Sequence, residues 1–238
     1  MDTEIMKEEA SSEIDVKQRL LDSGITLFGI RGLTGPTVRE ITDRAKCNLS
    51  AMNYYFGSRE RFLEAVLVHV FQPIRRRRDA TLKAAIERHP DRPVPVHELV
   101  EAWILPLLEA PRDEDGGRIV VRFIQQLWAD PAGRPLNFVQ HSYDYGAFSY
   151  IDAFCRSLPS FTRAEIVWRY EMMRGAALHA LADCDPISPT FKRLMTDQPG
   201  IDVEQTDLVR RQIVSYCASG FVAQPLWATS NLKEKEQG

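Results

Sequence analysis

Residues 38–55 read VREITDRAKCNLSAMNYY, and they decide which fold the rest of the chain must support. Their pattern predicts two short helices that cross at a steep angle, separated by a turn at residues 45–48. Such a helix-turn-helix needs apolar residues where its helices touch, a small residue at their closest approach, and a turn residue that tolerates a positive φ. The apolar contact positions are held by Ile41, Ala45, Cys47, Met52 and Tyr55.

Both short helices begin with capping residues. Thr37 and Glu40 form a Thr-x-x-Glu capping box, and Asn48 is a good N-cap for the helix predicted at residues 49–56. Two other positions are less typical of the motif, since Thr42 stands where Ala is usual and Lys46 where the turn usually has Gly. A non-glycine residue in the left-handed region costs about 1–2 kcal/mol, so Lys46 weakens the purely physical case.

One helix is predicted before this motif and a longer one after it. Apolar side chains recur on one face from Val16 to Phe28, and Arg31-Gly32 is a typical helix end. The helix after the motif contains Pro73, which predicts a kink or a break. Its apolar stripe comprises Phe62, Leu63, Val66, Leu67, Val70 and Phe71.

The remaining sequence also predicts helices, because apolar residues recur at spacings of three and four and no alternating strand pattern occurs. Proline and glycine mark the gaps between these segments. The predicted fold class is therefore all-α. The further helices are expected at residues 96–109, 118–130, 136–158, 163–183 and 203–223.

Composition restricts the class of protein. The 238 residues are 44% hydrophobic and 26% charged, with a formal net charge of −3. No segment approaches the ~20 apolar residues of a membrane span, and the N-terminus lacks a signal-peptide pattern, which predicts a soluble cytoplasmic protein without a membrane partner. Cysteine and histidine residues lack metal-ligand spacing, so we expect no disulfide framework, no metal and no cofactor.

The overall charge hides a segmental pattern. Residues 1–15 carry one Lys against six acidic residues, which predicts a disordered acidic tail. Residues 16–65 carry a net charge of +3, and the remainder carries −1. The last residues, 231–238, are predicted to form a polar tail. The moderately basic unit coincides with the helix-turn-helix, where a nucleic-acid partner would require positive charge.

Residues 19–67 resemble the N-terminal DNA-binding domain of the TetR family of bacterial transcriptional regulators. The resemblance rests on the LF pair at residues 27–28, the RG loop at 31–32, the TVREI start of the second helix at 37–41, and the NYYFGSRE junction at 53–60. Ser23-Gly24, Lys46 and Asn53 depart from the family pattern. The resemblance implies a DNA-binding domain at residues 16–62 and a ligand-binding and dimerisation domain at 63–230.

The start of the third helix is the expected reader of double-stranded operator DNA. A capped helix N-terminus can face phosphates or base edges, and small first-turn residues let the helix enter the major groove. Flanking side chains would contact phosphates and fix the register. The expected DNA-binding residues are Thr37, Arg39, Asn48, Leu49, Ser50, Ala51, Asn53, Tyr54 and Arg59. Some alternatives remain: Thr37 as a cap alone, Tyr55 and Phe56 as core, and Arg75–Arg78 as a solvated face.

The second half is rich in aromatic residues with interleaved polar ones, which favours an apolar cavity for a small-molecule effector. The expected ligand-binding residues are Trp103, Leu107, Arg122, Phe123, Gln126, Leu127, His141, Tyr145, Phe148, Trp168 and Met172. An alternative is that each of these is ordinary core lining. The resemblance further implies a homodimer formed through the last two long helices.

These features predict a sequence-specific transcriptional regulator, most simply a repressor released by an apolar or amphipathic ligand of fatty-acyl or aromatic type. We do not expect an enzyme, because the sequence contains no GxSxG, HExxH, P-loop or GxGxxG motif with supporting context. A helical enzyme that uses the aromatic pocket, and a protein-interaction module without a DNA role, are the alternatives.

Overall fold

The computed structural model describes the backbone of residues 2–112, 117–129, 136–185, 190–194 and 205–224. Within these ranges, side chains are described except at residues 2–14 and 136–145. The described chain is helical, as predicted, and no named strand occurs in it. In order, the helices are α1 Asp2–Arg31, α2 Val38–Arg44, α3 Leu49–Phe56, α4 Arg59–Glu87, α5 Val96–Leu108, α6 Ile119–Ala129, α7 Leu136–Ser157, α8 Arg163–Asp183, α9 Thr190–Leu194 and α10 Thr206–Val222.

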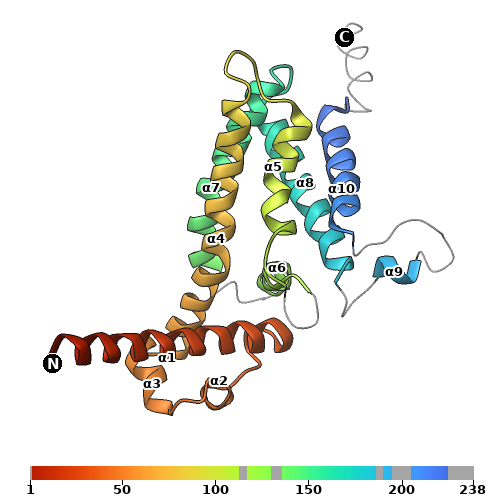
Figure 1. Ribbon diagram of the computed structural model, residues 1–238. Coiled ribbons are helices and arrows are strands. Elements are labelled where there is room, and N and C mark those ends of the chain that lie inside the picture. The colour runs from red at the N-terminus through yellow and green to blue at the C-terminus, as the bar shows by residue number, and fades with distance from the viewer. Residues whose placement is uncertain (1, 113–116, 130–135, 186–189, 195–204, 225–238) are drawn as a thin grey trace, which may run out of the picture.

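The helices form a small base and a larger upright bundle (Figure 1). In the base, α1 lies across the lower end of α4, with α2 and α3 beneath it. In the bundle, α5 packs against α4 and α10, while α7 and α8 pack against each other. Helix α6 lies between base and bundle and contacts both α1 and α8.

Two hydrophobic cores correspond to these two parts. The base core contains Phe28, Ile41 and Met52, and it also includes Phe123 and Leu127 of α6. The bundle core is built from α4, α5, α6, α7, α8 and α10 and contains, among others, Trp103, Tyr170 and Phe221. Because α4 and α6 contribute to both parts, the predicted division between residues 62 and 63 falls inside a continuous helix.

The base requires a close approach between α1 and α4. A Cβ atom on Gly24 would lie 2.6 Å from the ring of Phe62, so only glycine fits without displacing that ring. Thus the Ser23-Gly24 pair, which departs from the family pattern, has a packing explanation here. Ser23 and Gly24 are both buried.

The structure corrects the prediction for the N-terminus, excludes one of the two alternatives at Pro73, and adds a helix. Helix α1 begins at Asp2, so residues 2–15 are helical and not a disordered tail; they contain no Gly or Pro and are rich in helix-forming Glu, Lys, Met and Ala. Pro73 lies inside α4 and does not break it, because buried Leu67 and Ile74 fix the helix on both sides of the proline. The short helix α9 was not predicted.

Candidate nucleic-acid interface and ligand cavity

The capping box that starts α2 is present in full. The Glu40 carboxylate accepts hydrogen bonds of 2.8 Å from both the backbone N–H and the hydroxyl of Thr37, and the Glu40 N–H donates to Thr37 Oγ1 at 3.3 Å. Arg31 donates to the same carboxylate at 2.8 Å. Since both donors of Thr37 are engaged by Glu40, the structure favours the capping role of Thr37.

These contacts lower the pKa of Glu40 to about 2, chiefly through the backbone hydrogen bond from Thr37 and then the hydrogen bond from Arg31. A carboxylate with a lowered pKa stabilises the folded state above its ordinary pKa of 4.5. This contribution is lost as the pH falls from 4.5 towards 2. The start of α2 therefore stays capped throughout the neutral range.

The turn between α2 and α3 has the geometry that the motif requires. Lys46 adopts φ 53°, and it is the one non-glycine residue with positive φ in the described part of the chain. Thr42 is buried at the crossing, and its hydroxyl donates to the Arg39 carbonyl at 3.0 Å. The chain thus forms the turn without glycine and satisfies the buried hydroxyl locally.

Helix α3 exposes one face to solvent, and this face carries both polar and apolar side chains. Asn48 caps the helix, because its side-chain oxygen accepts from the Ala51 N–H at 3.0 Å and from the Ser50 hydroxyl at 2.7 Å. The exposed residues of the helix include Leu49, Ser50, Asn53 and Tyr54, whose spacing places them on one face. Tyr54 is 73% exposed, and its ring packs edge-on against Tyr55. Phe56 is buried, in agreement with the core alternative.

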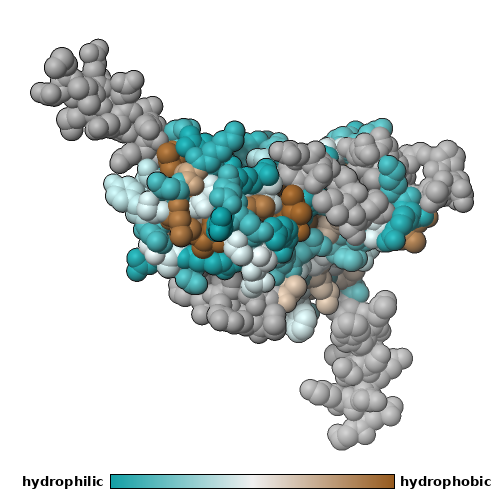
Figure 2. Space-filling view, turned by 90° about the horizontal axis from the view of Figure 1, so that it is seen from below, coloured by the Kyte–Doolittle hydropathy of each residue, from teal (hydrophilic) through white to brown (hydrophobic). Residues whose placement is uncertain are grey.

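Figure 2 views the molecule from below, the side on which α2 and α3 lie in Figure 1. Hydrophilic residues cover most of this face, with a smaller apolar area among them. Base edges in a DNA groove offer both hydrogen-bonding groups and methyl groups, so a face with hydrophilic and apolar areas suits them.

The two arginines that were expected beside α3 differ in their surroundings. Arg39 is strongly exposed, and its Nε lies 3.9 Å from a carboxylate oxygen of Asp43. Arg59 is partly buried: its Nη2 donates to the carbonyls of Leu33 at 2.9 Å and Pro36 at 3.2 Å, and its guanidinium lies 5.6 Å from the centre of the Phe28 ring. Arg59 therefore holds the α1–α2 connection, which differs from the phosphate contact expected for it.

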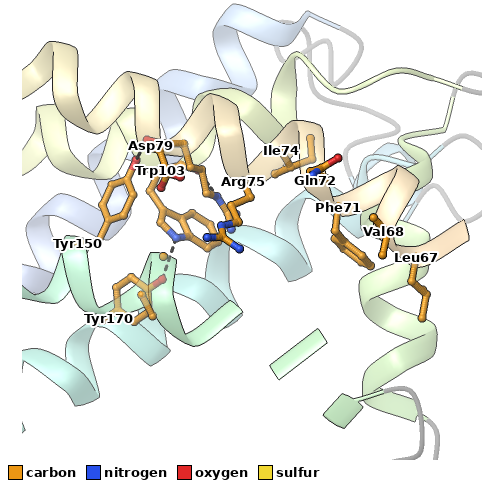
Figure 3. A pocket seen from close by; sticks show the side chains of 13 residues that line it. Leu67, Val68, Phe71, Gln72, Ile74, Arg75, Asp79, Trp103, Tyr150 and Tyr170 are labelled. Carbon is orange, nitrogen blue, oxygen red and sulfur yellow. Dashed lines mark hydrogen bonds between the residues drawn. The ribbon is translucent and has the colours of Figure 1, made fainter. Parts of the chain in front are cut away.

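A cavity of about 150 Å³ lies in the bundle between α4, α5, α7 and α8 (Figure 3). Trp103 lies between Tyr150 and Tyr170, with Arg75 and Asp79 of α4 nearby. The Trp103 N–H donates to the Tyr170 hydroxyl at 3.0 Å. The full lining is Leu67, Val68, Phe71, Gln72, Ile74, Arg75, Arg78, Asp79, Trp103, Gly146, Ala147, Tyr150 and Tyr170.

Of the residues expected to bind ligand, Trp103 lines this cavity and most others do not. Leu107 is bundle core, whereas Phe123 and Leu127 belong to the base core. Phe148, Trp168 and Met172 are 55%, 69% and 65% exposed, because they lie on the outer faces of α7 and α8. The side chains of His141 and Tyr145 lie outside the described residues.

Among the polar residues expected in the cavity, Arg122 and Gln126 have structural partners instead. Arg122 forms a buried two-point ion pair with Asp185, with N–O distances of 2.7 and 2.8 Å. The Gln126 side chain donates to the carbonyls of Phe28 at 2.9 Å and Gly29 at 3.0 Å, near the end of α1. Gln126 thereby connects α6 to α1 in the base, and Arg122 connects α6 to the segment after α8 in the bundle.

Sequence reasoning missed most of the cavity lining. For Arg75–Arg78 the sequence suggests a solvated face or a DNA contact, and the expected ligand-binding residues do not include Tyr150 or Tyr170. The available signal was the spacing of Phe71, Arg75 and Arg78 on one face of α4, since residues three or four apart are neighbours on a helix. Aromatic content alone does not distinguish cavity lining from core or from an exposed face.

A second apolar feature is the outer surface of α8 and α10, which pack against each other. Trp168 and Met172 of α8 and Tyr216 and Val222 of α10 are all more than half exposed. Large exposed apolar residues at such density are uncommon on a monomer. Among the described residues, no group of three His, Cys, Asp or Glu side chains is placed to hold a metal, and no described helix could cross a membrane.

The architecture combines a helix-turn-helix base with a larger helical bundle, and two family models match the sequence of these parts. The model described as bacterial regulatory proteins, tetR family, matches residues 20–66. The model described as tetracyclin repressor-like, C-terminal domain, matches residues 101–220. The chain belongs to the TetR family of bacterial transcriptional regulators. Regulators of this family bind DNA operators and often act as dimers with ligand effectors.

One curated protein resembles part of the chain, and solved structures share its fold. The HTH-type transcriptional repressor NicS of Pseudomonas putida is 33% identical over 55 residues, which are 23% of this chain and 26% of NicS. The chain therefore matches about a quarter of that relative's length. PfmR from Thermus thermophilus shares the fold, with a TM-score of 0.57, 13% identity and coverage of 87% of this chain and 99% of PfmR. A protein from Shewanella sp. PV-4, described as a putative tetR family transcription regulator, shares the fold with a TM-score of 0.54 and 17% identity. The similarity covers 86% of this chain and 96% of that protein.

Proposed function

We propose that this regulator is a dimeric repressor that binds an operator through α3 and is released by a small ligand bound in the bundle cavity. The observation that carries the DNA-binding part is the exposed face of α3, formed by Leu49, Ser50, Asn53 and Tyr54 behind a capped N-terminus. Such a helix can place apolar and hydroxyl groups against base edges. Arg39 and Tyr54 are proposed to contact phosphates.

Repression is supported by a similar curated protein, NicS, which is named a transcriptional repressor. Dimerisation is proposed through α8 and α10, since a second copy would cover their exposed Trp168, Met172 and Tyr216. A symmetric dimer holds two copies of α3 at a fixed separation, as two half-sites about one helical turn apart require.

Ligand control is proposed to act through α4. This helix follows α3 directly and supplies Leu67 both to the base core and to the cavity lining. A ligand that fits the cavity better when α4 is shifted would favour dimers with altered α3 spacing. It can shift that equilibrium only by its difference in affinity for the two forms.

DNA binding is tested with Arg39→Ala, and Arg76→Ala serves as a matched control that removes an exposed arginine far from α3. We expect Arg39→Ala to weaken binding to every duplex by a similar factor, because a phosphate contact is lost. The slope of log affinity against log salt concentration should become shallower by about one. Affinity is measured by fluorescence anisotropy at several salt concentrations. Equal affinities for both variants would contradict the proposed contact.

A separate experiment is needed to decide whether the chain represses or activates transcription. A reporter placed behind the operator should be silent when the chain is expressed and active when its gene is deleted. Higher reporter output in the presence of the chain would show activation and overturn the proposed repression.

A further inference from the structure

The four consecutive arginines of α4 have different surroundings. Arg77 pairs with Glu109 at 3.1 Å, and the Arg78 guanidinium lies 3.9 Å from the centre of the Trp103 ring. Arg75 and Arg76 are both exposed to solvent, but Arg76 is absent from the lining of the bundle cavity. Arg75 does line that cavity, and it forms no ion pair with any residue that the structure describes. Arg75 is thus a cation available at the cavity.

The aromatic polar groups of the cavity already hydrogen-bond within the protein, which leaves Gln72 as the neutral amide of the lining whose side chain has no hydrogen-bond partner among the described residues. The Trp103 N–H donates to Tyr170, and the Tyr150 hydroxyl donates to the Arg78 carbonyl at 3.1 Å. Arg78 donates its Nε to the Trp103 carbonyl at 3.2 Å. A ligand therefore meets few unused neutral donors, and the charged groups dominate its recognition.

The described lining also carries more positive than negative charge. Arg75 and Arg78 contribute two cations, and Asp79 contributes the one carboxylate. Because Arg78 stacks on an aromatic wall of the cavity, its charge is held against the apolar interior. An arginine forms its strongest hydrogen bonds with carboxylates, which accept from two of its nitrogens at once.

The size and walls of the cavity restrict the body of the ligand. Aromatic side chains form much of its wall, namely Phe71, Trp103, Tyr150 and Tyr170. Its volume is about 150 Å³, and an apolar cavity of about that volume in another protein accommodates benzene. The space therefore suits one ring or a comparably small apolar group.

From these observations we infer that the effector is a small monocarboxylate with an apolar body of about one aromatic ring, and that Arg75 binds its carboxylate. This inference rests on the proposed function, in which the effector occupies the bundle cavity. It adds the chemical class of the ligand and a residue that determines specificity.

The experiment compares acids with their uncharged amides. Binding of benzoate, phenylacetate and 3-phenylpropionate, and of the three corresponding amides, is measured by calorimetry on the full chain. We expect at least one acid to bind about tenfold or more tightly than its amide. Arg75→Gln should remove that preference, whereas Arg76→Gln should retain it, since Arg76 is the neighbouring cation outside the cavity.

The outcomes separate this inference from the proposed function. Equal binding of acid and amide in every pair, no binding of any acid, or loss of preference in both variants would overturn the monocarboxylate assignment. Circular dichroism of both variants shows whether each is folded, and Arg75→Lys should restore part of the preference. Release of bound DNA by other small molecules would still support the proposed ligand control, whereas an acid that binds without releasing DNA would count against it.

Discussion

Lys46 illustrates how a single residue can carry backbone strain within a recognisable motif. It holds φ 53° in the turn between α2 and α3, where a side chain raises the energy of the left-handed conformation. We expect Lys46→Gly to increase the free energy of unfolding by up to about 1 kcal/mol, because glycine avoids the clash but has more freedom to lose on folding.

Urea denaturation checks this prediction, and Lys46→Ala is the control because it removes the charge but keeps a Cβ atom. Lys46→Gly should be more stable than Lys46→Ala. The reverse order would mean that the turn is not strained at this position.

Arg59 leads to a prediction about stability where the sequence had suggested DNA contact. Its side chain donates to two carbonyls, those of Leu33 and Pro36, and lies against Phe28. Hydrogen bonds from a charged group contribute about 1.5–3 kcal/mol, so Arg59→Ala should lower the free energy of unfolding by about that amount. Thermal or urea unfolding of the isolated protein measures it. Unchanged stability together with weaker DNA binding would instead support the prediction that Arg59 contacts a phosphate.

At the scale of elements, α6 is the connection that most depends on a buried charge pair. Arg122 and Asp185 are both more than nine-tenths buried, and they join α6 to the segment after α8. Removing one partner of a buried pair typically costs about 3–5 kcal/mol, because the other charge is left without compensation. We therefore expect Arg122→Met to be severely destabilised.

The double variant Arg122→Met with Asp185→Leu isolates the contribution of the pair. It should recover much of the loss, since an apolar replacement of both partners is often neutral or stabilising. Urea denaturation of the two single variants and the double variant gives the interaction energy. Additive losses would show that the two charges do not interact.

Most helices could be predicted from the sequence because their boundaries depend on local chemistry. Proline, glycine and capping residues act on the nearest turn, so the ends of the helices from α5 to α8 were predicted to within one residue, and those of α10 to within three. The helical N-terminus was missed because net charge does not distinguish a disordered tail from a charged helix. The continuity of α4 through Pro73 depends on packing by both cores, which local sequence does not reveal.

The candidate sites show the same division between local and distant interactions. The exposed face of α3 follows from the spacing of consecutive residues. The cavity, by contrast, brings together α4, α5, α7 and α8, so its lining depends on tertiary packing. Trp168 and Trp103 are both tryptophans within long helical segments, but one is 69% exposed and the other is fully buried.

At the scale of the whole molecule, the proposed dimer explains how a DNA-binding part with only a small positive net charge could bind DNA. Each unit of residues 16–65 carries a net charge of only +3, so two units at fixed spacing are expected to be necessary. We expect Trp168→Glu combined with Tyr216→Glu to give a monomer whose DNA affinity is at least tenfold lower. Both side chains are exposed, so folding should be preserved.

Sedimentation velocity and anisotropy measure the two effects of this double variant. Asp91→Asn serves as the control, since Asp91 is exposed and lies outside α8 and α10. A double variant that remains dimeric would exclude this face as the interface, and a folded monomer with full DNA affinity would exclude the need for a dimer.

Selection of the full chain against a random duplex library tests the central claim most directly. The predicted result is enrichment of an inverted repeat whose half-site centres lie about one helical turn, ~34 Å, or a multiple of it apart. This result would show both sequence-specific binding and two-fold symmetry. Failure to enrich any sequence over the starting library would contradict the proposal that the chain is a dimeric, sequence-specific regulator.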